Sequence, residues 1–384
     1  MDVSVFLHLV LQEISSGGQG LRPYLIGFND QSLYERCRKA LKDLRYSHPA
    51  LASIEERPII SSLRCYFPKR LEQRWYPFKQ ALTVEEDTRM LIKTTFRTTS
   101  TGERGIPWGV RHIKAPHAWS TTTGHRVRIG VIDTGADYHH PDLRHSLLSG
   151  INFVQPGRPP QDDNGHGTHI AGTIAAANQM YGIIGVAPRA LIHPVKSFDE
   201  NGSAYVSDIV QGIEWCVRNK LHLINMSFGM KTRSKSLLNA VTQATNAGIA
   251  VVASSGNDAK RKTIDYPARY SQTISVGATD NSRRIAPFSN RGTYVDIYAP
   301  GDKIVSAWLH GNYHEMSGTS MATSHVSGAI ALLLALKPEL KPTEIKALLR
   351  RTANPIYPLR GRASSIKESA AGEIDIARLL QECR

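Results

Sequence analysis

The stretch Met316-Ser-Gly-Thr-Ser-Met-Ala-Thr-Ser-His-Val-Ser-Gly328 runs directly into an apolar segment, Ala329 to Leu336. Gly318 permits a sharp turn of the backbone, and Thr319 or Ser320 can cap a helix whose apolar residues recur at helical spacing. The pattern therefore predicts a helix over 320–336 that begins at Ser320. Its N-terminus would favour negative charge beside the Ser320 hydroxyl, as a nucleophile requires. Taken alone, however, such a stretch is more often an ordinary helix cap, so the rest of the chain has to decide.

The length and the cysteine content limit the class of protein. A chain of 384 residues is long enough for one large α/β domain and a smaller unit. The cysteines lie far apart without a CxxC pair, which favours neither a disulfide framework nor a zinc site. Scattered thiols of this kind are typical of a reducing compartment. They are Cys37, Cys65, Cys216 and Cys383.

The formal net charge of +14 does not predict a nucleic-acid partner, because the basic residues are spread along the chain rather than clustered with aromatics. We find no segment that approaches the roughly 18 apolar residues of a membrane span. The first residues, Met1 to Glu13, predict an amphipathic helix, since Asp2 stands where an export signal would have basic residues. We therefore expect a cytoplasmic monomer without membrane contact, and secretion is the alternative.

Residues 1–105 are expected to form a small α+β unit of their own. Tyr24 to Phe28 predicts a strand and Gln31 to Leu44 a charged helix, and short strands are expected near 59–66 and 81–84. The segment 97–105 is rich in Thr, Ser and Gly and lacks periodicity, which is typical of a flexible linker.

Residues 106–384 are expected to form an α/β domain, because predicted strands and helices alternate from Arg126 onward. The pattern indicates a doubly wound, mostly parallel sheet with helices on both faces. The predicted strands are 126–133, 191–198, 221–228, 249–254, 273–278 and 295–299. The predicted helices are 166–177, 207–220, 234–247, 320–336 and 342–351.

Three predicted strand ends or loops carry polar residues at the edge where such folds bind ligands. Asp133 ends an apolar strand, His166 stands between two glycines at the opening of a helix, and Asn257 follows another strand. With Ser320 they supply a nucleophile, a base, a residue that orients the base, and a donor to an oxyanion.

The four segments that carry these residues strongly resemble the subtilisin-like serine proteases, in that family's order Asp, His, Ser. They are Val131-Ile-Asp-Thr-Gly135, Asn164-Gly-His-Gly-Thr-His169, Ala253-Ser-Ser-Gly-Asn257 and Ser317-Gly-Thr-Ser-Met-Ala322. The resemblance covers about Ile106 to Arg351. It implies the subtilisin fold and hydrolysis of peptide bonds by Asp133, His166 and Ser320, with Asn257 in the oxyanion hole. One departure is Ser324, where the family usually has proline; we expect a small effect, because proline is tolerated rather than required in the first helical turn.

Two other function classes are weighed against this one. A catalytically silent homologue that binds peptides is disfavoured by the complete set of four residues. An esterase of the α/β-hydrolase type requires G-x-S-x-G and the order Ser, Asp, His, and neither is present.

The resemblance also implies two edges that pair with an extended peptide substrate. They are Gly202, Ser203 and Ala204 on one side and Ser227, Phe228 and Gly229 on the other. Asp265 matches a position at the base of the pocket for the P1 side chain, and Asp258 follows the oxyanion asparagine. A carboxylate there favours Lys or Arg at P1, although Asp265 is equally compatible with a solvated loop.

A structural calcium ion is a further implication of the resemblance. The family's site would draw on Asp142, on the amide position Gln179, and on carbonyl groups of the loop 177–183, including Ala177, Tyr181 and Ile183. Calcium takes six to eight oxygen ligands. Arg104 stands where the family has another ligand near the mature N-terminus, and a cation cannot serve there.

The N-terminal unit resembles the family's propeptide through two short segments, Tyr24 to Phe28 and Val84 to Asp87. The resemblance implies that this unit assists folding, inhibits the enzyme and is removed by self-cleavage, which we expect within 97–105. The alternative is a permanent accessory domain for partner binding. The expected partners are thus protein or peptide substrates and the chain's own propeptide.

Overall fold

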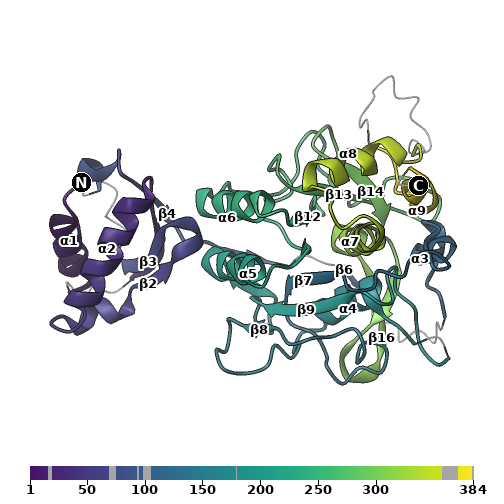
Figure 1. Ribbon diagram of the computed structural model, residues 1–384, viewed down its shortest axis with the longest axis horizontal. Coiled ribbons are helices and arrows are strands. Elements are labelled where there is room, and N and C mark those ends of the chain that lie inside the picture. Colours follow the sequence, from purple (N-terminus) through teal and green to yellow (C-terminus); the bar gives the residue numbers. More distant parts are fainter. Residues whose placement is uncertain are drawn as a thin grey trace.

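The computed structural model describes residues 1–15, 20–68, 75–92, 95–97, 105–178, 180–356 and 371–382. Its N-terminal residues form a unit that lies beside helices α5 (Val206–Arg218) and α6 (Lys235–Asn246) of a larger α/β body (Figure 1). The two units are connected through the segments that precede residue 105.

A seven-stranded sheet forms the centre of the larger body, and its strands run in the order β14-β13-β12-β11-β7-β9-β8. All of its described pairs are parallel. Strands β11 to β14 are buried along their whole length, as expected for a parallel sheet covered on both faces. The strands are β7 Arg128–Asp133, β8 Ile151–Asn152, β9 Leu191–Lys196, β11 Leu223–Met226, β12 Ala250–Ser254, β13 Ile274–Thr279 and β14 Ile297–Pro300.

Helices cover both faces of this sheet, which confirms the predicted doubly wound fold. Helices α4 (His166–Ala175) and α7 (Thr319–Leu336) share one apolar cluster with the sheet. Helices α5 and α6 share a second cluster on the other face. The remaining helices of this body are α3 Trp108–His112, α8 Pro342–Thr352 and α9 Ile376–Gln381.

Helix α7 corrects one expectation, because its 18 residues are long and apolar enough to cross a membrane by composition alone. In the folded chain, however, 89% of that window is buried, and the helix packs against β11, β12, β13 and β14. The apolarity of α7 therefore reflects its place at the centre of the protein core.

Two short sheets border the central one. Strands β15 (Ile304–Ala307) and β16 (Tyr313–Ser317) form an antiparallel pair, and β6 (Thr95–Arg97) adds to β16. Strand β10 (Ser203–Tyr205) pairs antiparallel with β5 (Arg89–Leu91). The sequence did not predict these strands, since each has only three to five residues and is fixed by its partner.

The N-terminal unit has its own apolar core. Helices α1 (Val3–Ser15) and α2 (Gln31–Leu44) accompany an antiparallel sheet with the order β2-β3-β1-β4, and aromatic contacts join Phe6 to Phe28, Trp75 and Phe78. The strands are β1 Arg22–Phe28, β2 Glu55–Arg57, β3 Ser62–Phe67 and β4 Leu82–Glu86. Helix α2 has the predicted bounds, while most of the expected linker 97–105 lies outside the described residues.

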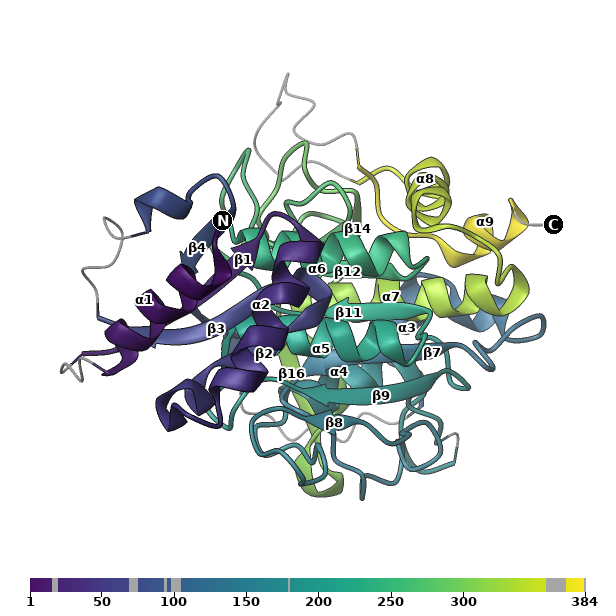
Figure 2. The same ribbon diagram turned by 60° about the vertical axis from the view of Figure 1, so that its left-hand side comes forward.

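The N-terminal unit lies in front of and beside α5 and α6 in Figure 2, and hydrogen bonds connect it to the N-termini of both helices. The Glu85 carboxylate accepts hydrogen bonds from the amides of Lys235 and Ser236, at 2.8 and 3.0 Å, and the Asp87 carboxylate accepts one from the Ser207 amide at 2.9 Å. Both acids thus satisfy donors that a helix cannot satisfy itself, and both lie at the positive end of a helix dipole.

Candidate active site

Asp133 and His166 come together at the end of β7 and the start of α4. His166 Nδ1 lies 2.7 Å from Asp133 Oδ1, and both residues are fully buried. Gly165 adopts φ +105°, and a side chain at Gly167 would collide with the Gly135 carbonyl. Gly167 therefore permits the close approach of α4 to the loop after β7.

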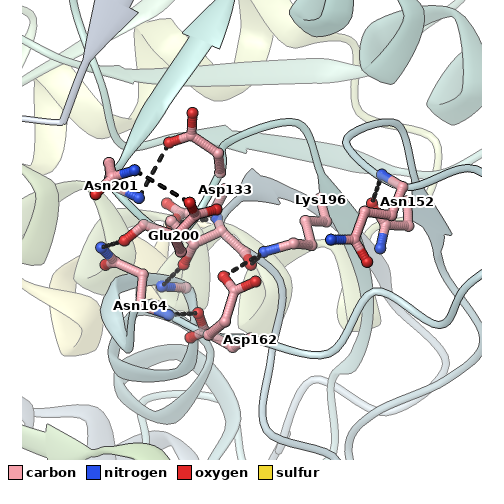
Figure 3. A network of polar contacts seen from close by, with 12 residues as sticks. Asp133, Asn152, Asp162, Asn164, Lys196, Glu200 and Asn201 are labelled. Atoms are coloured by element: carbon pink, nitrogen blue, oxygen red, sulfur yellow. Dashed lines mark hydrogen bonds and ion pairs between the residues drawn. The ribbon is translucent and has the colours of Figure 1, made fainter.

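A polar network holds the loops on either side of this pair (Figure 3). The Asp162 carboxylate accepts from the amides of Asn164 and Gly165, at 2.9 and 3.0 Å, just before α4 begins. The buried Lys196 ammonium donates to the Thr134 carbonyl at 2.7 Å, directly after Asp133, and pairs with the Asp163 carboxylate at 2.6 Å. The network ties the two segments that carry Asp133 and His166 to each other, which limits their relative movement.

Ser320 is the second residue of α7 and is 3% exposed. Its hydroxyl donates to the Ser227 carbonyl at 2.8 Å, and His166 Nε2 has no hydrogen-bond partner in the part of the chain that the structure describes. The described residues therefore show no hydrogen bond between Ser320 and His166 in this conformation. A serine hydroxyl changes its direction by rotation about χ1, and catalytic hydrogen bonds often form only when substrate is bound.

Asn257 lies on the loop after β12 and is held by the residue before Ser320. Its side-chain oxygen accepts from the Thr319 amide at 2.9 Å and from the Thr319 hydroxyl at 2.8 Å. Because both bonds engage the oxygen, the NH₂ end of the amide is the end that can donate beside Ser320, with which Asn257 lines a pocket.

Ser324 occupies the first part of α7 without interrupting it. Its hydroxyl donates back to the Ser320 carbonyl at 3.0 Å, within the helix and away from solvent. The residue in place of the family's usual proline is thus accommodated by a local hydrogen bond.

The predicted substrate edge 202–204 is paired with the chain's own N-terminal segment. Ser203 and Ala204 are paired with Leu91 and Met90 in the antiparallel register of β10 and β5, and the Ile92 amide donates to the Gly202 carbonyl at 2.9 Å. The side chain of Met90 is buried among apolar residues of the larger body. An extended segment of the N-terminal unit therefore occupies the edge that the sequence assigned to substrate.

The other predicted edge forms a wall of the pocket beside Ser320. Ser227, Phe228 and Gly229 line this pocket together with Gly256 and Asn257. Asp265 also lines this pocket and is 4% exposed, so it is not a solvated loop residue.

Asp265 and Asp258 share a partner that the sequence reasoning missed. The Lys231 ammonium lies 2.7 and 3.1 Å from the two Asp265 oxygens, and it also contacts the Asp258 carboxylate. The only signal in the sequence was the place of Lys231, two residues after the predicted edge 227–229.

The residues expected to hold calcium do not fit that ion in their described arrangement. Asp142 Oδ1 accepts a hydrogen bond from the Asn178 side-chain amide at 2.7 Å. Asp142 Oδ2 accepts from the Ile183 backbone amide at 2.9 Å and from the Tyr313 hydroxyl at 2.8 Å. Hydrogen-bond donors thus occupy the positions beside the Asp142 carboxylate that a calcium ion would need.

The other expected ligands add no support for a calcium site. The Ile183 carbonyl accepts from the Asn178 backbone amide at 3.2 Å. The backbone amide of Tyr181 donates to the Asn178 side-chain oxygen, and that of Ala177 donates to the Asp142 carbonyl. Gln179 and Arg104 lie outside the described residues. Within the described ranges, no group of three or more His, Cys, Asp or Glu side chains is placed to hold a metal.

His169 lies three residues after His166, but its contacts are those of a structural residue. It is fully buried, its Nε2 lies 3.0 Å from the Ile304 carbonyl and 3.1 Å from the His314 carbonyl, and burial lowers its pKa to about 3. His169 is therefore neutral and fixed by backbone, whereas His166 contacts the carboxylate at the strand end.

The chain matches a known family over most of this body. Residues 124–373 match the Subtilase family, Peptidase_S8. The chain belongs to the subtilase family, and it is a serine endopeptidase of the subtilisin type.

Three curated relatives illustrate the extent of the match. An alkaline protease of Alkalihalobacillus alcalophilus is 38% identical over 341 residues, which cover 88% of each chain. Subtilisin E of Bacillus subtilis (strain 168) is 36% identical over 348 residues, 86% of this chain and 85% of that protein. Subtilisin Savinase of Lederbergia lenta is 44% identical over 252 residues, 65% of this chain and 92% of that protein. The first two alignments are longer than residues 106–384, so they extend into the N-terminal unit.

Proposed function

We propose that Ser320 is the nucleophile of this endopeptidase, His166 its general base and acid, and Asp133 the residue that orients the imidazole. The observation that carries the assignment is the 2.7 Å contact of His166 Nδ1 with Asp133, which leaves Nε2 as the free ring nitrogen. A proton on Nδ1 makes Nε2 the basic atom, as proton removal from a serine hydroxyl requires.

The proposed reaction begins when Ser320 Oγ attacks the carbonyl carbon of the scissile peptide bond and its proton passes to His166 Nε2. The Asn257 amide then donates to the developing oxyanion, since its oxygen is already engaged by Thr319. The imidazolium returns the proton to the leaving amine, and an acyl-enzyme remains. Water, deprotonated by the same histidine, releases the acid and restores Ser320.

We further propose that the enzyme is made as a zymogen whose N-terminal unit is its inhibitor. This proposal is supported by the pairing of β5 with the substrate edge at β10, because a chain segment at that edge excludes a peptide substrate. It is also supported by the alignments with the alkaline protease and subtilisin E, which include part of this unit.

The course of the chain favours a particular bond for self-cleavage. Ile92 is bonded to Gly202 at the end of one paired segment, and Thr95 is paired with Ser317, three residues before Ser320. We propose that the bond between Lys93 and Thr94, which joins these segments, is the one cut. Residues 93 and 94 lie outside the described part, and the proposed bond is upstream of the segment 97–105 that the sequence favoured.

A preference for Lys or Arg at P1 is the third part of the proposal. It is supported by Asp265, whose buried carboxylate lines the pocket beside Ser320. A cut after Lys93 agrees with that preference. Charge-assisted hydrogen bonds to a carboxylate in a pocket favour a basic side chain over an apolar one of similar size.

The experiment that tests these proposals compares the purified protein with its Ser320→Ala variant by intact mass and N-terminal sequencing. We expect the wild type to lose residues 1–93 and the variant to remain whole. Ser317→Ala is a matched control on β16 and should still be cut. Two full-length proteins would contradict self-cleavage, and a new N-terminus within 97–105 would contradict the proposed bond. Peptide hydrolysis that persists in Ser320→Ala would contradict the assignment of the nucleophile.

A further inference from the structure

Lys231 is placed beside the P1 pocket by the backbone rather than by chance contact of a mobile side chain. The Met230 amide donates to the Tyr266 carbonyl at 2.8 Å, and the Tyr266 amide donates to the Met230 carbonyl at 2.9 Å. These reciprocal bonds fix the segment after the edge 227–229 against the segment that carries Asp265. Lys231 and Asp265, which follow and precede the two bonded residues, are therefore neighbours by the geometry of an antiparallel bridge.

The pocket wall leaves Asp265 little freedom to move away from Lys231. A Cβ atom added at Gly229 would lie 2.7 Å from Asp265 Cβ, and one added at Gly256 would lie 2.6 Å from Asp265 Oδ2. The carboxylate thus lies against the backbone of both walls. The side chain of Asp265 is 6% exposed, while those of Lys231 and Asp258 are 39% and 29% exposed. Lys231 is the most exposed member of the group, and Asp258 is its second partner, more exposed than Asp265.

The charges of this group balance only when a basic side chain enters. Asp258 and Asp265 supply two negative charges, and Lys231 supplies one positive charge. A Lys or Arg at P1 that reaches Asp265 has to share that carboxylate with Lys231 or displace it. A neutral P1 side chain, in contrast, meets a carboxylate that Lys231 already neutralises, so its burial leaves no unpaired charge.

We propose that Lys231 is a specificity-determining residue, a built-in counter-ion that pairs with Asp265 while a neutral P1 side chain is bound and moves to Asp258 when a basic one enters. This inference rests on the proposed function of Asp265 in the P1 pocket. Its consequence is a pocket that accepts both classes of substrate, with a smaller preference for basic residues than Asp265 alone would give. The exchange needs no movement of the backbone, because Lys231 contacts both carboxylates from one position.

The test is Lys231→Met, which removes the ammonium and keeps most of the aliphatic stem. We expect kcat/KM for peptides with Lys or Arg at P1 to rise about tenfold relative to matched Leu or Phe peptides, because Asp265 loses its competing cation. Lys260→Met is the matched control, since Lys260 is exposed on the neighbouring loop and its loss changes the net charge equally. In Asp265→Asn, adding Lys231→Met should leave the ratio unchanged, because the carboxylate on which the two cations compete is absent.

A second measurement keeps the inference testable without catalysis. Benzamidine, a cation of P1 size, is titrated by calorimetry into the protein and its Lys231→Met variant after self-cleavage and removal of residues 1–93, and we expect about tenfold tighter binding in the variant. An unchanged P1 ratio together with unchanged benzamidine affinity would overturn the inference, and so would a loss of basic preference in Lys231→Met. If the wild type shows no preference for basic P1 residues and Lys231→Met acquires one, the inference about Lys231 is sustained. The proposed P1 preference of the wild type then fails.

Discussion

The catalytic unit and the N-terminal unit bury their charged groups against different kinds of partner. In the catalytic unit, Asp133 contacts His166 of the same unit, and both are covered by its own core. In the N-terminal unit, Glu85 and Asp87 contact helix N-termini of the other unit. The first arrangement is fixed when one unit folds, whereas the second exists only while two units are docked. The contacts within the catalytic unit should thus be permanent and those between the two units reversible.

Asp133→Asn should produce the largest loss of activity, because the amide no longer selects the imidazole tautomer with a proton on Nδ1. We expect kcat to fall about 10⁴-fold with little change in KM, as for the same change in other serine proteases. Steady-state kinetics on one peptide substrate measures the effect, and Asp302→Asn, on the loop after β14, is the control. A fall in kcat of less than tenfold would show that Asp133 does not orient the base.

Asn257→Leu should lower kcat by about 10²- to 10³-fold, since one donor to the oxyanion is lost while the volume of the side chain is kept. The same kinetics check this prediction. Thr319→Ser retains the hydroxyl that holds Asn257 in place, and it should retain most of the activity. An effect confined to KM would contradict a role in the transition state.

Glu85→Ala should weaken docking of the N-terminal unit by about 2- to 30-fold, the equivalent of the 0.5–2 kcal/mol expected for a lost helix cap. Dilution of the cut complex, followed by peptide hydrolysis, measures the release of inhibition. Glu86→Ala is the matched control, because its exposed carboxylate pairs with Arg22 of the same unit. Equal release from both variants would contradict the view that contacts across the interface hold the inhibitor.

Docking should also depend on pH through Asp208, in the first turn of α5. Burial raises its pKa from an ordinary 3.8 to about 6, while Arg64 and Arg57 act to lower it and Asp87 to raise it. A raised pKa means that the docked state binds the proton more tightly. The stabilisation is complete below the ordinary value and is lost as the pH rises through about 6.

Release of the N-terminal unit should therefore be easier at pH 7.5 than at pH 5, to the extent that docking supplies the burial of Asp208. The dilution experiment, repeated at both values, measures the difference, and Asp208→Asn should abolish it. Easier release at the lower pH in the wild type would reverse the predicted sign.

The smallest effect is expected from removal of calcium. Because donors engage both oxygens of Asp142, excess chelator should leave the melting temperature unchanged. A site filled at 100 times its dissociation constant would instead contribute about 2.7 kcal/mol to the free energy of unfolding. Tyr313→Phe removes one donor to Asp142, and we expect it to destabilise the protein by about 1–3 kcal/mol with or without calcium.

The sequence by itself determined the fold class, the order of the longer central strands and helices of the catalytic unit, and the four residues of the proposed catalytic site. Periodicity marks long buried elements such as α7 because burial selects apolar residues over many turns. Glycines beside His166 were informative for a similar reason, since a close backbone approach excludes other side chains.

Only the tertiary structure decided the short strands β5, β6 and β10, the engagement of Asp142 by donors, and the place of Lys231 between two carboxylates. These features depend on partners distant in the sequence: Lys231 and Asp265 are 34 positions apart, and Ser203 and Leu91 are 112 apart. A three-residue strand or a single lysine carries too little pattern to reveal its partner. The charges and hydrogen bonds that it meets are set by the packing of the whole chain.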